Sequence, residues 1–398
     1  MSQRLNLLDP AVRDDPYSFY ARLRRESPVC QVEPGGVWAI SRYDDVVHAF
    51  KNPQIFSSAG LRMATEPAWL GRHNPISDSL VMMDPPLHGR MRTLVSRAFT
   101  LSLINRVESY ARDVCERMAA IALEKRKVDF VSEFALAVPT NLLAILIGFD
   151  PALQVHFKRW GDDIGGASAV SPEDTVRMAQ VRTSIDEMER YMRTLIKERR
   201  SKPRDDLVSE LLAVQVDGER LTDDELVGFL SVLLAAGLET TVFLLANSVR
   251  LLAEHPQWMD RLRTTTTLIP GFIEEVLRFE PPAQSTLRLV TTDTEVGGVP
   301  LKAGSIALLL VGSALRDEEH YPNADQFNPE RGVPTNLAFG HGIHFCLGAA
   351  LARMEVRVAL DTLLAMCSKF ELRTDRIEWG QSLTVRWPNS LPLEIFPL

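Results

Sequence analysis

A stretch near the C-terminal end of the chain, FGHGIHFCLG (residues 339–348), places one cysteine among three glycines and two histidines. Its spacing, His341-x-x-His344-x-Cys346, resembles part of a zinc site. Zinc takes four ligands in a tetrahedral arrangement, usually from two separated pairs, and no second pair lies nearby in the sequence. Cys346 could also be a Cys–His nucleophile, although a recognisable orienting partner is lacking, or a buried structural thiol.

The surroundings of Cys346 favour a ligand over a plain buried thiol. Gly342 and Gly348 permit a tight turn and a close approach of the backbone to something flat or bulky. Residues 347–364 predict a strong helix, so the sulfur lies at a helix N-terminus, where free N–H groups and the helix dipole favour a thiolate. A soft thiolate is what an iron ligand needs.

The pattern Phe339-x-x-Gly342-x-x-x-Cys346-x-Gly348 resembles the haem-binding loop of the cytochromes P450, the haem-thiolate monooxygenases. The resemblance covers residues 10–398. It implies a mainly α fold with small β-sheets, shaped as a triangular prism, in which haem b lies between a long central helix and the cysteine loop. It also implies that Cys346 is the iron ligand and that the other three residues of the pattern contact the haem.

A second motif, Glu275-x-x-Arg278, matches the E-x-x-R of the same family. Taken alone it carries little information, because Glu and Arg three residues apart stabilise many exposed helices by a few tenths of a kcal/mol. In the family the pair is buried and joined by an arginine from a downstream loop, a position that Arg331 matches in FNPER. The two interpretations therefore differ in the burial of this pair.

A third motif, AGLETT (residues 236–241), places an acid and two hydroxyls in a helix that is otherwise apolar. Unpaired buried polar groups are costly, so these residues need a role. The resemblance implies that Thr240 turns its hydroxyl toward the carbonyl of residue 236 and opens a groove for dioxygen. It also implies that Glu239 relays protons and that Ala236 and Gly237 lie against the haem.

The resemblance extends to the groups that bind the haem propionates. His88 and Arg92 are four residues apart and share one face of a helix. Arg288 and His344 match the family's other propionate partners. Without the family context, a solvated surface charge would explain each of these residues equally well.

By the family pattern, substrate contacts one face of the central helix, the segment after E-x-x-R and a turn between the C-terminal strands. These side chains are mostly small, which predicts a roomy apolar site for a fatty acid, terpenoid, steroid or macrolide-like compound. The opposing interpretation is that they only accommodate large neighbours. The predicted pocket residues are Val232, Ala235, Ala236, Ala283, Gln284, Ser285, Thr384 and Val385.

The predicted function is a monooxygenase that inserts one oxygen atom from O2 into an apolar small molecule, by hydroxylation or epoxidation. Electrons come from a separate ferredoxin or flavodoxin, for which Arg90, Arg97 and Arg353 are docking candidates. Two rival functions are a peroxide-driven haem enzyme and a haem-binding sensor without turnover. Neither would need the acid–alcohol pair of Glu239 and Thr240.

Composition sets the wider limits. The chain has 398 residues, a net charge of −8, 45% hydrophobic and 24% charged residues, so it does not resemble a nucleic-acid binder. Four scattered cysteines and the lack of an N-terminal apolar run predict a reduced, cytoplasmic protein without a membrane anchor. The uncharged run at residues 226–238 is followed by Glu239, so we expect a buried core helix rather than a membrane span. We expect a monomer.

The motifs must be positioned by a mostly helical chain with a small β portion, forming one domain over residues 1–398. A Thr222-x-x-Glu225 capping box predicts the start of the central helix. Residues 52–86 are rich in Pro, Gly, Ser and Asn and predict a long binding loop. The remaining patterns predict helices at 14–25, 43–51, 87–98, 102–125, 130–148, 172–200, 246–263, 268–279 and 347–369, and strands at 36–41, 286–311 and 370–396.

Overall fold

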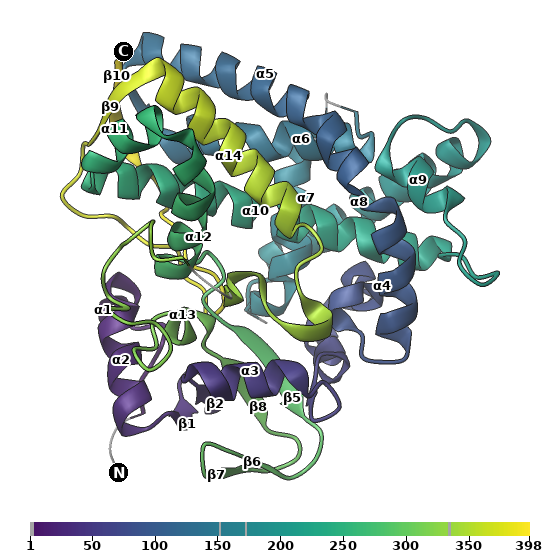
Figure 1. The fold of residues 1–398 in the computed structure, drawn as a ribbon. Coiled ribbons are helices and arrows are strands. Elements are labelled where there is room, and N and C mark those ends of the chain that lie inside the picture. Colours follow the sequence, from purple (N-terminus) through teal and green to yellow (C-terminus); the bar gives the residue numbers. More distant parts are fainter. Residues whose placement is uncertain (1–3, 151–152, 172, 333–335) are drawn as a thin grey trace. The chain divides into compact units, whose positions relative to one another are not determined.

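The computed structural model of the 398-residue chain describes residues 4–150, 153–171, 173–332 and 336–398. Its contacts divide the chain into two compact units, and each is described by itself. The first unit comprises residues 1–57, 112–137 and 240–398, and the second comprises residues 58–111 and 138–239. Two long helices, α5 (Leu101–Lys125) and α10 (Asp223–Glu254), belong to both units (Figure 1). The single domain over the whole chain stays a prediction.

All strands that the structure describes lie in the first unit. The largest sheet has the order β1-β2-β8-β5-β3, and only the pairing of β2 with β8 is parallel. A three-stranded sheet has the order β4-β10-β9, and β6 pairs with β7. The bounds are β1 Val29–Val32, β2 Val37–Ile40, β3 Phe56–Ser57, β4 Lys127–Asp129, β5 Thr286–Val290, β6 Thr294–Val296, β7 Val299–Leu301, β8 Ile306–Leu309, β9 Cys367–Leu372 and β10 Pro392–Pro397.

Helices cover both faces of the five-stranded sheet, because successive side chains of a strand point to opposite faces. On β8, Leu309 packs in a buried cluster with residues of α3 (Tyr43–Lys51). Its neighbour Leu308 packs in a different cluster with residues of α2 (Pro16–Glu26). The first unit also contains α1 (Pro10–Asp14), α11 (Gln257–Thr264), α12 (Ile269–Phe279), α13 (Val311–Ala314) and α14 (Ala349–Met366).

The second unit is helical. Its irregular segment, residues 58–86, contains only short 3₁₀ turns, at Ala59–Thr65, Ala68–Leu70, Pro75–Asp78 and Leu80–Met82. The loop predicted at residues 52–86 is confirmed from residue 58 onward, whereas Phe56 and Ser57 form β3, and its binding role stays a prediction. The longer helices are α4 (Leu87–Ala98), α6 (Ala137–Ile147, whose first residue belongs to the first unit), α7 (Gln154–Gly166), α8 (Thr175–Ser201) and α9 (Leu207–Ala213).

The mainly α prediction with a small β portion is confirmed, and the bounds predicted for α3 and α4 match the observed ones. Several other boundaries were wrong. The helix predicted at 14–25 is α2, which starts two residues later because Asp15 caps it, and the short helix α1 before it was not predicted. α10 continues to Glu254 instead of stopping near residue 245, and the chain turns at Pro256. The sequence patterns also missed α7 and α9.

The start of α10 is fixed by the predicted capping box. The hydroxyl of Thr222 accepts a hydrogen bond from the N–H of Glu225 at 3.2 Å, and the Glu225 carboxylate accepts one from the N–H of Thr222 at 2.8 Å. By length and composition α10 could cross a membrane, but 61% of its most apolar window is buried. Burial of this kind is typical of a core helix.

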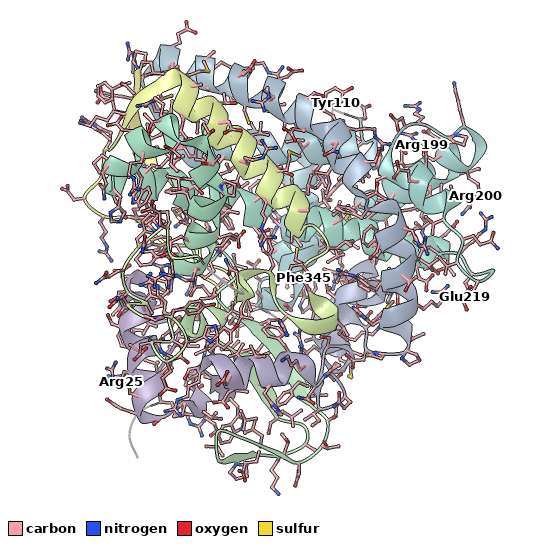
Figure 2. The ribbon with its side chains drawn as sticks, in the orientation of Figure 1. Arg25, Tyr110, Arg199, Arg200, Glu219 and Phe345 are labelled. Carbon is pink, nitrogen blue, oxygen red and sulfur yellow. The ribbon has the colours of Figure 1, made fainter. Side chains whose placement is uncertain are left out.

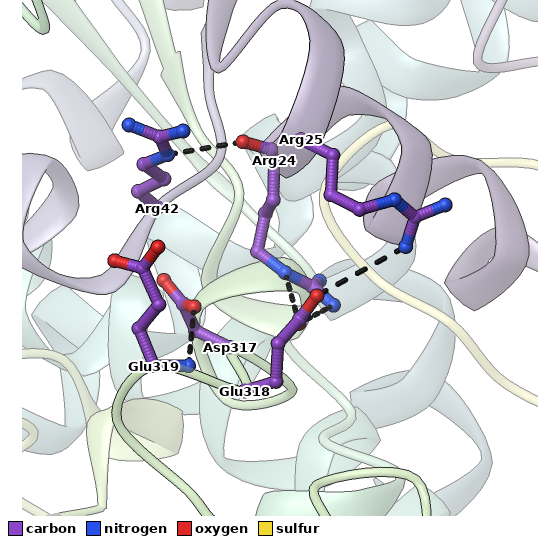
Figure 3. A pocket seen from close by; sticks show the side chains of 6 residues that line it. All are labelled: Arg24, Arg25, Arg42, Asp317, Glu318 and Glu319. Carbon is purple, nitrogen blue, oxygen red and sulfur yellow. Dashed lines mark hydrogen bonds and ion pairs between the residues drawn. The ribbon is translucent and has the colours of Figure 1, made fainter.

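One surface hollow of the first unit is lined by equal numbers of arginines and acids (Figure 3). Arg24 is 3% exposed, pairs with Glu318 at 2.7 Å and donates to the carbonyl of Ser313. Asp317 accepts a hydrogen bond from the N–H of Tyr43 at 2.8 Å. Glu318 pairs with Arg24 and Arg25, and Arg42 donates to the carbonyl of Arg24, so this hollow is a structural junction between the end of α2, the start of α3 and the loop after α13.

Candidate functional site

The loop before α14 turns sharply around Cys346. Gly340 and Gly342 adopt positive φ angles of 76° and 69°, a region that glycine enters without strain. A Cβ atom on Gly342 would lie 2.8 Å from the carbonyl oxygen of Phe50, so no larger residue fits. The N–H of Cys346 donates to the carbonyl of Phe339 at 2.9 Å and closes the loop.

The side chain of Phe339 is held by an ion pair. The guanidinium of Arg353, on α14, lies 4.4 Å from the centre of the Phe339 ring and pairs with Glu274 of α12 at 2.5 Å. Asn336 donates to the Glu274 carboxylate at 3.2 Å and accepts from the N–H of Ala338. The loop is thus fastened to α12 and α14 on both sides of Phe339.

Phe345, 40% exposed, lies on the segment before α14 (Figure 2).

The four cysteines differ in exposure. Cys346 is exposed, whereas Cys115 and Cys367 are buried and Cys30 is half-buried. Burial raises the pKa of Cys115 and of Cys367 to about 12, so both stay thiols at neutral pH. Only Cys346 lies just before a helix N-terminus, three residues ahead of Ala349. Within the described part of the chain, no three His, Cys, Asp or Glu side chains gather as a metal ion such as zinc would need.

The Glu275–Arg278 pair is buried. Both side chains are 0% exposed, and two hydrogen bonds of 2.7 and 2.8 Å join the guanidinium to the carboxylate. Arg278 also donates to the carbonyls of Leu315 and Ala324, each at 2.9 Å. An exposed pair three residues apart on a helix would remain in contact with water, so the complete burial of both side chains excludes the surface interpretation of the motif.

Arg331 joins this pair as the resemblance implies. Its Nε lies 3.4 Å from a Glu275 oxygen, and its Nη2 donates to the carbonyl of Gln326 at 2.7 Å. The same Glu275 oxygen accepts from the N–H of Asn328 at 2.8 Å. Glu275 therefore connects α12 to the segment at residues 323–331.

In the second unit, Glu239 is half-buried on α10. Burial, a hydrogen bond that Glu239 donates to Asp162 of α7, and the negative charge of Asp162 together raise the pKa of Glu239 to about 7, while Lys158 opposes the change. Helix is continuous through residues 236–241. The predicted groove beside Thr240 stays a prediction.

The predicted propionate partners fall on one helix of the second unit and two segments of the first. His88 is 2% exposed on α4, and burial together with the charge of Arg92 lowers its pKa, which places these two side chains close together. Arg288 is 8% exposed on β5 and donates to the hydroxyl of Thr286 at 3.0 Å. His344 is partly buried in the loop before Cys346.

Sequence and fold match those of one enzyme family along almost the whole chain. A model of the cytochrome P450 family matches residues 4–379. The chain belongs to the cytochrome P450 family. Cytochrome P450 109 of Bacillus spizizenii is 36% identical over 385 residues, which cover 96% of this chain and 92% of the relative.

Solved structures of P450s agree with this assignment. The structure of CYP109Q5 from Chondromyces apiculatus has a TM-score of 0.92 and 36% identity, and the match covers 100% of both chains. That of CYP109E1 from Bacillus megaterium in complex with testosterone has a TM-score of 0.86 and 32% identity, covering 97% of this chain and 99% of the other. The protein has the P450 fold, is a P450 monooxygenase, and its cofactor is haem b.

The residues of the loop fit a haem thiolate. Cys346 presents one exposed sulfur at the end of a tight turn, and the backbone of Gly342 packs where a side chain would clash. The chemistry of this donor, a single soft thiolate near a helix N-terminus, suits iron.

The predicted pocket segments of the P450 are joined within the first unit. Ala283 forms an isolated bridge with Val385, and the N–H groups of Gln284 and Ser285 donate to the carbonyl of Thr384 at 2.8 and 3.2 Å. Ala283, Thr384 and Val385 are partly exposed. Gln284 and Ser285 are 4% exposed and use their side chains internally, on Tyr17 and Leu383. Backbone hydrogen bonds therefore hold these two segments together.

On α10, the small residues meet α7. A Cβ on Gly165 would lie 3.7 Å from the Cβ of Ala235, so Ala235 faces α7. Val232 is half-buried and Ala236 is exposed. A large side chain at Ala235 would disturb the contact between the two helices, so Ala235 is a poor position for testing the pocket.

Two of the three docking candidates are already paired. Arg90 binds Glu219 and Glu225 and donates to the carbonyl of Arg220, while Arg353 pairs with Glu274. Arg97 is exposed at the end of α4. Sequence reasoning missed Glu274 and Asp162, because neither belongs to a motif and both act through contacts that are distant in the sequence.

Proposed function

We propose that this P450 oxidises a bulky apolar compound, with Cys346 as the axial ligand of haem b. The proposal is carried by one observation: of the four cysteines, all within described residues, Cys346 alone is exposed, and it lies on a tight glycine turn. The chemistry that haem b supplies when bound is the insertion of one atom of dioxygen into the substrate, while the other leaves as water. His88, Arg92, Arg288 and His344 would bind its propionates.

Glu239 and Thr240 would supply protons for the cleavage of dioxygen. Glu239 suits this role because its pKa of about 7 leaves part of the carboxyl protonated at neutral pH. The hydroxyl of Thr240, the next residue on α10, can donate and accept a hydrogen bond. The pair also argues against the peroxide-driven enzyme and the sensor, which need no proton relay.

We expect Thr240→Ala to separate substrate binding from oxygen activation. The variant should keep the spin-state shift on substrate addition and divert most electrons from NADPH into hydrogen peroxide, because the hydroxyl that guides protons is lost. The ratio of product to NADPH consumed measures this. The control is Thr241→Ala, which removes a threonine hydroxyl from the next residue of α10, where the side chain is buried. It should keep normal coupling, and equal coupling in both variants would remove the role of Thr240.

The proposed substrate class follows from small residues on two hydrogen-bonded segments. Ala283 and Val385 are partly exposed on hydrogen-bonded backbone, and neither offers a polar group to orient a ligand. A relative of similar fold was solved with testosterone. We therefore favour a steroid-sized or longer lipophile, oxidised by hydroxylation or epoxidation.

We expect Ala283→Phe to exclude bulky lipophiles while slim ones still bind. The phenyl ring adds volume on a backbone that is pinned by Val385 and cannot recede. Spin-state titrations with a steroid and with a linear fatty acid measure the change, and steroid affinity should fall at least tenfold. Ala303→Phe, on the exposed turn between β7 and β8, is the control. If Ala283→Phe binds the steroid like wild type, Ala283 does not line the pocket.

Electrons would come from a separate acidic ferredoxin or flavodoxin. The internal pairing of Arg90 and Arg353 leaves Arg97 as the candidate with an exposed side chain. We expect the protein to work in the cytoplasm, where such partners and NADPH-driven reductases are present.

A further inference from the structure

Helix α7 approaches α10 closely in the second unit because two glycines face it. A Cβ on Gly161 would lie 3.2 Å from the carbonyl oxygen of Leu234 and 3.4 Å from the Cα of Ala235. Gly165, one turn later on α7, faces Ala235 as well. Glu239 follows Ala235 by four residues and therefore shares its face of α10. The glycines thus bring the polar side chains of α7 within reach of Glu239.

The group that reaches Glu239 is another carboxyl. Asp162 and Glu239 form a side-chain hydrogen bond. Two carboxyl groups can be hydrogen-bonded only when one of them carries a proton, so this pair holds a shared proton.

Asp162 also connects the pair to solvent. The ammonium group of Lys158 binds both oxygens of Asp162, at 2.7 and 3.0 Å. The side chains of Lys158 and Asp162 are 47% and 38% exposed. The ammonium group of Lys158 lies on Asp162, and the pKa of Glu239 is raised to about 7, so the shared proton resides on Glu239.

The remaining charges around this pair are engaged elsewhere. Asp163 pairs with Arg177 of α8 at 2.5 Å, and Arg159 pairs with Glu187 of α8. On α10 no other charged residue occurs between Leu226 and Ser248, and α6 carries none. Lys158 and Asp162 are therefore the charged groups that act on Glu239.

We propose that Asp162 is a positioning residue for Glu239, which holds the acid in its protonated form and refills it with protons from solvent. Each time Glu239 gives up its proton, Asp162 takes one from water and passes it on, so one solvent proton enters for each proton used. The proposal rests on the role of Glu239 given above. It adds the source of the proton and the group that sets the charge state of Glu239.

The proposal predicts shifts of opposite sign in two variants of α7. Because Glu239 donates a proton, turnover should fall as the pH rises through its pKa of about 7. Asp162→Asn removes a negative charge and offers an amide donor to the Glu239 carboxylate. The pH at which turnover falls by half should therefore decrease by about one unit or more. Lys158→Gln removes a positive charge, so the pH at which turnover falls by half should increase by roughly half a unit.

The profiles are measured as product formed with NADPH and a surrogate ferredoxin system. The matched control is Arg159→Gln, which removes one positive charge from a neighbouring side chain that is 43% exposed. Its profile should coincide with that of wild type. Shifts of the same sign in the two test variants, or equal shifts in all three, would overturn the proposal.

A second measurement does not depend on turnover. The infrared band of the protonated Glu239 carboxyl is obtained by subtracting the spectrum of Glu239→Gln from that of wild type. The subtraction also removes the band of Glu355, a buried carboxyl whose pKa is raised to about 8. The band should titrate near pH 7 and at lower pH in Asp162→Asn. If Glu239→Gln slows turnover but Asp162→Asn matches Arg159→Gln in both measurements, Asp162 has no role. If Glu239→Gln itself leaves turnover unchanged, the proposed role of Glu239 fails.

Discussion

Replacing Cys346 with histidine should abolish the red-shifted Soret band of the reduced carbonyl complex, which reports a thiolate on the haem iron. An imidazole is a neutral nitrogen ligand that gives the iron less electron density than a thiolate does. Monooxygenase turnover should fall to background for the same reason. The reduced carbonyl difference spectrum of the purified holoprotein measures the effect directly, and haem content is determined in parallel.

The matched control for Cys346→His is Cys30→Ala, which removes a half-buried thiol on β1. It should leave the band in place. The buried Cys115 and Cys367 cannot substitute as ligands, because burial holds their pKa values near 12 and keeps both as thiols. An unchanged spectrum in Cys346→His would therefore remove the central assignment rather than point to another cysteine.

The haem loop could be predicted from the sequence because its determinants are local. The positive φ of Gly342 and the helix that follows Cys346 depend on neighbouring residues, so the pattern could be read from the sequence, and its resemblance to a known family supplied the haem assignment. The capping box at Thr222 is local in the same sense, and its hydrogen bonds were found as predicted. Local patterns also predicted α3 and α4 with their observed bounds.

What the sequence could not show depends on tertiary packing. Lys158 and Asp162 look like an ordinary surface pair four residues apart on a helix, and nothing in their spacing indicates a second carboxyl on α10. Arg90 looked available for a partner protein, but residues 219–225, more than a hundred positions later, neutralise it. The end of α10 was placed too early because the run stays amphiphilic after Leu245 and only Pro256 stops it.

Glu275→Ala should yield little or no haem-loaded protein. The substitution leaves Arg278 fully buried with its charge uncompensated, although it keeps its bonds to the carbonyls of Leu315 and Ala324. Removing one partner of a buried ion pair costs about 3–5 kcal/mol, a large share of the stability of a typical domain. In the same step the N–H of Asn328 loses its acceptor and Arg331 loses one of several. Haem content per chain and the midpoint of denaturant unfolding measure the loss.

The control for this prediction is an ion pair of similar length on the surface. Glu330 binds Arg261 at 2.6 Å, against 2.7 Å for Glu275 and Arg278, but its side chain is 45% exposed. Glu330→Ala should cost under about 1 kcal/mol and give normal holoprotein, because water replaces the lost contact. The two variants delete the same carboxyl group at nearly the same distance from an arginine, so their difference isolates burial. Equal yields of holoprotein would mean that the E-x-x-R pair does not hold this part of the fold, despite its burial.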